Sequence, residues 1–198
     1  ADRVMLGHHS GSALAAMQIA GPLEWTLVSI TSAFAVGTLA LVGLAVGARD
    51  HDAARRHTTM ALVVALVLGV LVALAAFAVI LPALPLALPN AGASMRLAQE
   101  YLQAALLAAP FYCVGMAGFA ALSAAGDTVT PLKIGALVNV VHVGINWLLI
   151  DGHAGFPALG VRGAGISTSF SYAAEALLTI LALSRTSGAA TFRPYSWP

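Results

Sequence analysis

The sequence predicts an all-α fold, a polytopic transmembrane bundle of about five spanning helices. Three observations carry this prediction: 60% of the 198 residues are hydrophobic, only 9% are charged, and the mean hydropathy is +0.90. Soluble domains have about 25% charged residues, and a soluble chain of this size would expose much of this apolar surface to water. A bilayer removes the conflict, and the alternating pattern of outer-membrane strands is absent.

Five segments are long enough to cross a hydrocarbon core of about 30 Å, which takes about 20 apolar residues in a helix. In chain order they cover residues 22–47, 59–83, 100–123, 132–151 and 163–184. The connectors carry turn residues, in order Gly47–Asp52, Pro82–Gly92, Gly126–Thr128 with Pro131, and Gly152–Gly160 with Pro157. Because these connectors are short, successive helices are expected to lie antiparallel.

The charges exclude one function class and suggest an orientation. A net charge of +1, with nine scattered Lys and Arg residues, argues against nucleic-acid binding. One side of the predicted bundle carries Arg49, Arg55, Arg56, Lys133, Arg185 and Arg193, and the other carries Arg3, Arg96 and Arg162. By the positive-inside rule the first side is cytoplasmic. We therefore expect an integral membrane protein of a prokaryotic cytoplasmic membrane, with membrane lipid around it.

The fourth predicted span has a polar stripe formed by Asn139, His142 and Asn146, at positions i, i+3 and i+7 of one helix face. Histidine titrates near neutral pH and could take part in proton coupling, while the amides can coordinate a cation or bind a substrate. The alternative is that the stripe only joins helices, since interhelical amide hydrogen bonds contribute roughly 1 kcal/mol each.

Two other spans place carboxylates at membrane depth, where ionisable groups usually face an internal cavity. Thr168 and Glu175 lie seven residues apart on one face of the last span, and Glu175 suits proton or sodium binding unless it pairs with an arginine from elsewhere. Glu24, with Thr31 and Thr38 on its face, could line an aqueous route. Alternatively, Glu24 lies among the headgroups and the threonines bond to their own helix.

No motif for enzymatic chemistry is present in the sequence. There is no phosphate-binding glycine loop, no serine elbow and no HExxH pattern, and the histidines lack the spacing of zinc ligands. The single cysteine, Cys113, lies in an apolar run and permits no intrachain disulfide. We therefore expect neither an enzyme, nor a metal site, nor a prosthetic cofactor.

Several strings, in order and spacing, resemble the multidrug and toxic compound extrusion (MATE) transporters. They are Asp2-Arg3-Val4-Met5-Leu6-Gly7, Gly47-Ala48-Arg49-Asp50, Ala124-Ala125-Gly126-Asp127-Thr128-Val129-Thr130-Pro131-Leu132, Asn146-Trp147-Leu148-Leu149-Ile150 and Gly155-Phe156-Pro157-Ala158-Leu159-Gly160. The resemblance implies that residues 1–198 are a partial N-terminal lobe, with spanning helices two to six of six. It also implies a second lobe outside this chain, and export of cationic or amphipathic organic compounds coupled to H⁺ or Na⁺.

The resemblance also assigns residues. Asp2 matches the helix-one aspartate implicated in cation coupling, and Thr168 matches a helix-six hydroxyl of the same pocket. Asn146 falls where some members have an aspartate, and His142 replaces a frequent asparagine one turn earlier. The lost carboxylate at Asn146 puts the proton scheme of the aspartate-bearing members in doubt, and His142 or Glu175 would have to compensate.

Two other functions remain open at this point. One is a flippase for lipid-linked precursors within the same superfamily, for which a more basic cavity would be expected. The other is a membrane fragment or assembly module that does not transport, because a lone lobe cannot provide alternating access.

Overall fold

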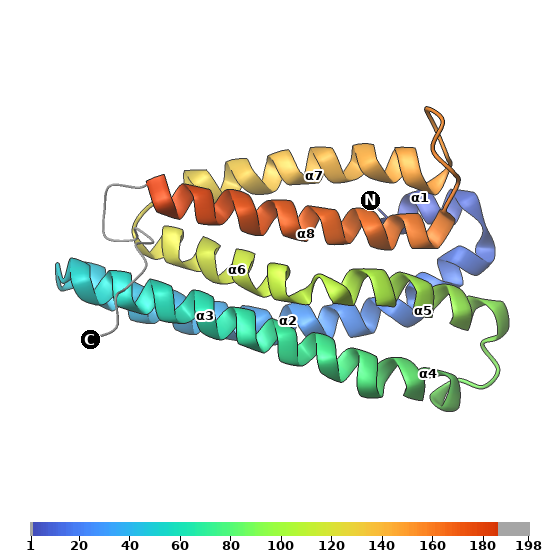
Figure 1. Cartoon of the computed structure of the whole chain (residues 1–198), viewed down its shortest axis with the longest axis horizontal. Coiled ribbons are helices and arrows are strands. Elements are labelled where there is room, and N and C mark those ends of the chain that lie inside the picture. The colour runs from blue at the N-terminus through green and yellow to red at the C-terminus, as the bar shows by residue number, and fades with distance from the viewer. Residues whose placement is uncertain (1, 186–198) are drawn as a thin grey trace.

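The computed structural model describes residues 2–185, apart from the side chains of His8 and His9, as a bundle of long helices lying side by side (Figure 1). Arg193, counted above, lies outside these residues. In the described part every regular element is a helix: α1 (Asp2–His9), α2 (Gly11–Gly47), α3 (His51–Ala75), the π-helix η1 (Ala76–Ile80), α4 (Leu81–Ala87), α5 (Gly92–Leu107), α6 (Ala109–Ala124), α7 (Val129–Ile150) and α8 (Gly160–Arg185).

Four helices of the described residues are long and apolar enough to cross a membrane, or five if α5 and α6 form one bent span. The predicted fold class is therefore confirmed. Helix α6 packs against α2, α3 and α8, and α7 packs mainly on α8. The chain thus forms one bundle, with α7 and α1 at one side of it (Figure 1).

Helix α2 begins at Gly11, well before the predicted start at residue 22. Ser10 caps it, because its hydroxyl oxygen accepts a hydrogen bond from the N–H of Ala13 at 3.1 Å. Pro22 lies inside the helix without ending it. At about 1.5 Å per residue, α2 is about 55 Å long and extends beyond a hydrocarbon core of about 30 Å.

The second span runs through α3, η1 and α4 as far as Ala87, although two prolines predicted a connector there. The π-helical turn precedes Pro82, and the N–H of Leu81 donates to Ala76 five residues earlier. Pro85 has no N–H for the carbonyl of Leu81, and the side-chain amide of Gln99 donates to that carbonyl instead, at 2.8 Å. A side chain of α5 thus replaces the missing backbone bond.

The third span is bent, with an angle of 50° between α5 and α6. The break falls at Ala108, two residues before Pro110, which cannot donate the backbone bond of a straight helix. Gly69 of α3 lies against this break, and a Cβ at Gly69 would meet the backbone of Pro110. Glycine therefore allows α3 to approach the bend closely.

Helices α6 and α7 are joined by a tight turn. Gly126 has φ +92°, a left-handed conformation that favours glycine. The carboxylate of Asp127 accepts a hydrogen bond from the N–H of Thr130 at 2.9 Å, and hydrogen bonds from Thr130 hold the pKa of Asp127 below its usual value. The turn directs α7 back beside α8.

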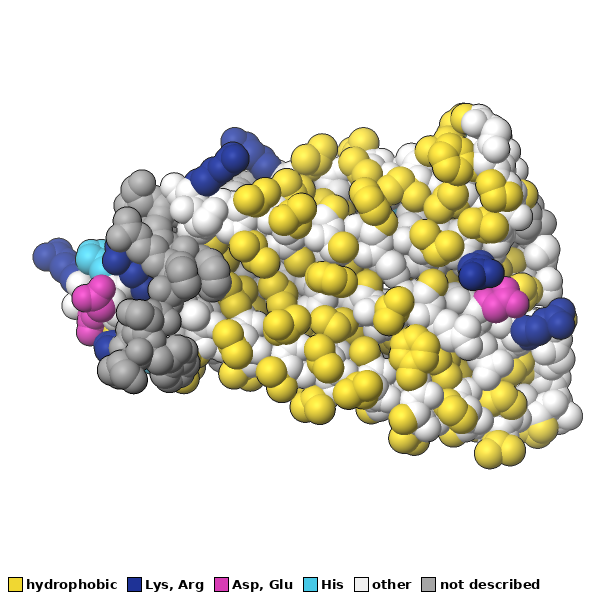
Figure 2. Space-filling view, in the orientation of Figure 1, with side chains coloured by type: hydrophobic (Ala, Val, Ile, Leu, Met, Phe, Trp, Pro, Cys, Tyr) yellow, Lys and Arg dark blue, Asp and Glu magenta, His cyan; other side chains and the backbone are white. Residues whose placement is uncertain are grey.

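On the face that Figure 2 shows, the charged side chains lie near the two ends of the bundle, with an apolar belt between them. The end formed by the α2–α3 turn, the α6–α7 turn and the end of α8 carries Arg49, Arg55, Arg56, Lys133 and Arg185. This grouping matches the one used above for the positive-inside rule. We call it the basic end.

Candidate functional site

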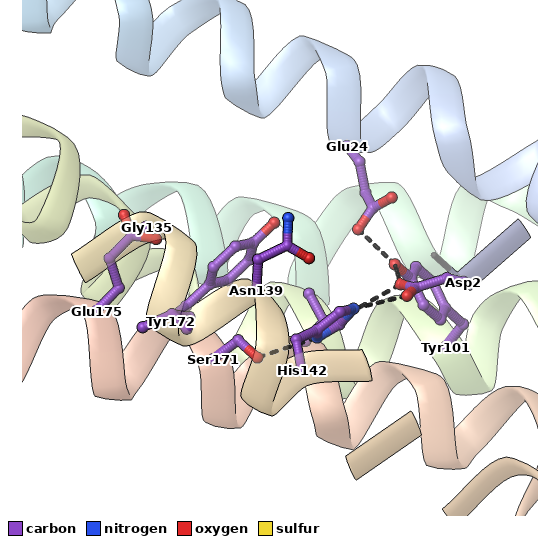
Figure 3. A pocket seen from close by; sticks show the side chains of 11 residues that line it. Asp2, Glu24, Tyr101, Gly135, Asn139, His142, Ser171, Tyr172 and Glu175 are labelled. Carbon is purple, nitrogen blue, oxygen red and sulfur yellow. Dashed lines mark hydrogen bonds and ion pairs between the residues drawn. The ribbon is translucent and has the colours of Figure 1, made fainter. Parts of the chain in front are cut away.

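A polar cavity of about 350 Å³ lies between α1, α2, α5, α7 and α8 (Figure 3). It is lined by Asp2, Glu24, Tyr101, Gly135, Val138, Asn139, His142, Thr168, Ser171, Tyr172 and Glu175. Three carboxylates line it, and the lining contains no lysine or arginine. All six residues that we selected from sequence lie at or beside this cavity, since Asn146 bonds to Asp2 within it.

The centre of the site is a pair formed by Asp2 and His142. Oδ1 of Asp2 lies 2.6 Å from Nε2 of His142, and the two side chains are 18% and 15% exposed. Asp2 is the first residue of α1, whereas His142 lies in the middle of α7, so this contact joins two elements that are far apart in sequence.

Two serine hydroxyls lie on the Nδ1 side of His142. The hydroxyl oxygen of Ser171 is 3.0 Å from Nδ1 and 2.8 Å from the carbonyl of Ser167, and that of Ser167 is 3.2 Å from Nδ1 and 3.1 Å from the carbonyl of His142. Each hydroxyl can accept from a protonated Nδ1 while donating to the carbonyl, or donate to an unprotonated Nδ1. The two serines therefore hold the ring in place in either tautomer.

The short contact between Asp2 and His142 requires a proton between the two atoms. A carboxylate oxygen and an unprotonated Nε2 would face each other with lone pairs, which is repulsive at 2.6 Å. The proton lies either on Nε2 or on the carboxyl group. In both cases the pair holds one proton between Oδ1 and Nε2.

Two further side chains hold Asp2 in place. The amide nitrogen of Asn146 donates to Oδ1 of Asp2 at 2.7 Å, and the hydroxyl of Thr168 lies 3.2 Å from Oδ2. Asn146 is fully buried, and its Oδ1 has no hydrogen-bond partner among the described residues. This oxygen is an acceptor available for a further donor or a cation.

A second carboxylate, Glu24, lies close to this pair. The hydroxyl of Tyr101 donates to Oε1 of Glu24 at 2.7 Å and lies 3.5 Å from Oδ2 of Asp2. Tyr101 is only 2% exposed, so its position is fixed by packing. Glu24 therefore belongs to the cavity.

The other end of the cavity contains Glu175, Tyr172 and Asn139 (Figure 3). Glu175 lies against α6, where a Cβ at Gly115 would be 3.1 Å from its Oε1. The ring of Tyr172 packs against that of Tyr112, with ring centroids 4.7 Å apart. Glu175 is thus a carboxylate of the cavity that lies at a distance from the cluster around Asp2.

Close helix contacts bring these side chains together. A Cβ at Gly165 would lie 2.8 Å from the carbonyl of Tyr101, so α8 and α5 can approach only because that residue is glycine. Likewise, a Cβ at Gly163 would lie 2.6 Å from the carbonyl of Leu149 on α7. The fully buried Leu6 helps to anchor α1.

The sequence reasoning missed Tyr101, Ser167, Ser171 and Tyr172 as site residues. A signal for the serines was present, since Ser167 and Ser171 continue at i+4 to Glu175 on one face of α8. Thr31 and Thr38 are buried, do not line the cavity, and bond to carbonyls of their own helix. For Thr31 and Thr38, the structure therefore agrees with the alternative in which the threonines bond to their own helix.

The described residues contain no group of three or more His, Cys, Asp or Glu side chains that could hold a metal ion. The fold and the cavity define a class of protein, a helical membrane protein with an internal polar site. Within this class, the family model described as MatE matches residues 1–148. The chain belongs to the MATE family.

Curated relatives support the same family. The chain is 29% identical over 187 residues to a probable multidrug resistance protein NorM of Thermotoga maritima, covering 93% of this chain and 40% of the relative. It is 32% identical over 174 residues to a protein of the same name from Rhizobium meliloti, covering 84% and 35%. A third relative, 27% identical over 172 residues, is an FAD transporter of Shewanella oneidensis, with 87% and 38% covered.

Solved structures show the same fold. An inward-facing multidrug resistance MATE family transporter has a TM-score of 0.85 at 22% identity, over 96% of this chain and 42% of the other. A MATE protein in the bent conformation has a TM-score of 0.85 at 23% identity, over 100% and 44%. The chain thus spans about two fifths of the length of the proteins it matches.

Proposed function

We propose that this chain is the N-terminal lobe of a secondary antiporter that exports organic cations, including drugs, in exchange for protons. The observation that carries the proposal is the acidic cavity in which Asp2 and His142 share a proton. A second lobe, outside this chain, would complete the substrate pathway and provide alternating access.

The charge of the cavity favours a cationic substrate. Of the three carboxylates, Asp2 bonds to His142 and Glu24 accepts from Tyr101, while Glu175 lies at the far end. The aromatic ring of Tyr172 adds a surface that attracts cations. Names of relatives, such as multidrug resistance protein, agree with such a substrate. An anionic lipid-linked precursor would be repelled by this lining.

The geometry favours protons over sodium as the coupling ion. When the shared proton leaves, Asp2 and Nε2 of His142 repel each other, and the contact between α1 and α7 weakens. Because an ion can drive a switch only by binding two conformations with different affinity, this proton-dependent contact is a suitable coupling element. Sodium is the alternative, with Asp2, Thr168 and the unpaired oxygen of Asn146 as ligands.

A transport assay tests the proposal and separates the two ions. The whole transporter, reconstituted in liposomes, is given either a proton gradient or a sodium gradient, and efflux of ethidium is followed by fluorescence. We expect efflux with the proton gradient alone. Efflux driven only by sodium would refute proton coupling, and no efflux of any organic cation under either gradient would refute the antiporter.

Glu175→Gln is expected to reduce selectivity for cationic substrates. Loss of one partly buried charge contact of about 1.5–3 kcal/mol predicts a KM for ethidium raised at least about tenfold. The KM for an uncharged substrate of similar size should change less than about twofold. The matched control is Glu100→Gln, on α5 and not among the residues that line the cavity. Equal effects on both substrates would exclude Glu175 as the cation-binding residue.

A further inference from the structure

A second hollow of the bundle lies on its outer face, away from the polar cavity. It is an apolar groove of about 350 Å³ between α3 and α8, with α6 as its floor. Its walls include Val63 and Leu66 of α3 and Leu177 of α8, and Phe111 of α6 lies at its inner end. All residues that line it are apolar. Figure 2 shows this apolar surface between the two ends of the molecule.

The groove exists because α3 and α8 both pack on α6 and have little contact with each other. Small residues deepen it on the α8 side, where Ala173 and Ala176 contribute no bulk. Val63, Leu66 and Leu177 are 56%, 46% and 59% exposed, so their side chains stand as walls beside the hollow. In a spanning bundle such an opening faces acyl chains.

One end of the groove points toward the basic end of the bundle. Arg55 and Arg56 precede the lining residues Leu62 and Val63 by seven positions each, which places them on the same faces of α3 about 10 Å nearer the end. Arg185 lies at the same end of the bundle, but five positions after the lining residue Ile180 it falls on a different face of α8. The cationic side chains beside the path that leads out of the groove are therefore those of Arg55 and Arg56.

Arg55 forms an ion pair with the carboxylate of Asp52. It lies 3.9 Å from Arg55 and is 87% exposed, and such exposed pairs contribute little. Nε of Arg55 is buried with no hydrogen-bond partner in the described part of the chain. Among the described residues, the guanidinium of Arg55 thus has one weak ion pair to offset its charge.

We propose that the groove and these arginines form a binding site for one anionic membrane phospholipid. An acyl chain lies along Val63, Leu66 and Leu177 toward Phe111, and the phosphate of the headgroup lies at Arg55 and Arg56. The separation between arginines and groove, about 10 Å, corresponds to the distance from headgroups into the acyl region. A protein helix would fill the hollow equally well, and the positive charge of Arg55 and Arg56 at its outer end favours a lipid with an anionic headgroup.

Native mass spectrometry of the protein in detergent micelles tests this site. Phosphatidylglycerol and phosphatidylcholine with identical acyl chains are added in turn, and the fraction of protein retaining one lipid is measured. We expect phosphatidylglycerol to bind with at least about tenfold higher affinity, because each arginine near an anionic lipid contributes about fivefold. Equal binding of the two lipids would overturn the proposal.

Matched variants locate the site. Arg55→Gln with Arg56→Gln should remove the preference for phosphatidylglycerol, whereas Arg49→Gln, at the same end but outside the groove, should keep it. Val63→Trp should fill the groove and weaken binding of both lipids at least about fivefold. Val67→Trp, 52% exposed on the same helix and not lining the groove, should leave binding unchanged.

Three outcomes would overturn the proposal: no loss of preference in the double arginine variant, equal effects of Val63→Trp and Val67→Trp, or loss of a dimer instead of a lipid in Val63→Trp. Retention volume and thermal unfolding in micelles verify that each variant is folded. None of these measurements depends on transport, so the site is tested separately from the antiporter.

Discussion

Asp2→Asn is expected to abolish proton-driven efflux by the reconstituted transporter. Asparagine keeps the size of the side chain but cannot exchange a proton with His142, so the contact between α1 and α7 no longer responds to pH. Loss of a charged hydrogen bond of about 1.5–3 kcal/mol predicts a decrease of at least about tenfold. The measurement is the initial rate of ethidium efflux under a fixed pH gradient.

The control for this experiment is Asp52→Asn, because Asp52 is 87% exposed and lies far from the cavity at the basic end. It should transport like the unmodified protein. Binding of ethidium without a gradient should persist in Asp2→Asn, since Glu24 and Glu175 still line the cavity. Unchanged proton-driven efflux in Asp2→Asn would remove this residue from the mechanism.

His142→Asn is expected to uncouple transport from the proton gradient while the fold remains intact. The asparagine amide can still donate to Asp2, but it does not titrate between about pH 5 and 8. Proton-driven efflux should fall at least about tenfold, and ethidium affinity, measured by equilibrium fluorescence, should become independent of pH over this range.

A histidine outside the cavity provides the comparison. His57 lies in α3 near the basic end, and His57→Asn should keep the pH dependence of the unmodified protein. If His142→Asn retained the original pH profile, the shared proton would have to reside on another group, with Glu24 and Glu175 as the remaining carboxylates of the lining. A gain of sodium-driven efflux would indicate that His142 selects the ion.

Composition was sufficient to predict the fold class, because few soluble arrangements could hide so much apolar surface. The ends and breaks of helices were harder to predict. Pro82 and Pro85 predicted a connector, but the π-helical turn and the amide of Gln99 compensate for the lost backbone bonds. That compensation comes from a residue on another helix, and no local pattern reveals it. The same holds for the bend at Ala108, which Gly69 accommodates.

The residues of the cavity were predictable only in part, because contacts between helices are not visible in a local sequence pattern. Polar residues at helical spacing selected His142, Asn146 and Thr168, and the resemblance added Asp2. Which side chains meet depends on helix packing, so the bond between Glu24 and Tyr101 could not be derived from either residue alone. That Ser167 and Ser171 lie beside Nδ1 of His142 also follows only from the coordinates.

The bend between α5 and α6 divides one span into two halves. The α6 half packs against α2, α3 and α8, and the α5 half packs against α2 and α8 and carries Tyr101 toward the cavity. A missing backbone hydrogen bond at Pro110 lowers the energy needed to change the angle between them. Because α5 is itself packed against α2 and α8, a change in this angle would have to shift those helices together with the phenol of Tyr101, which would couple the bend to the rest of the lobe.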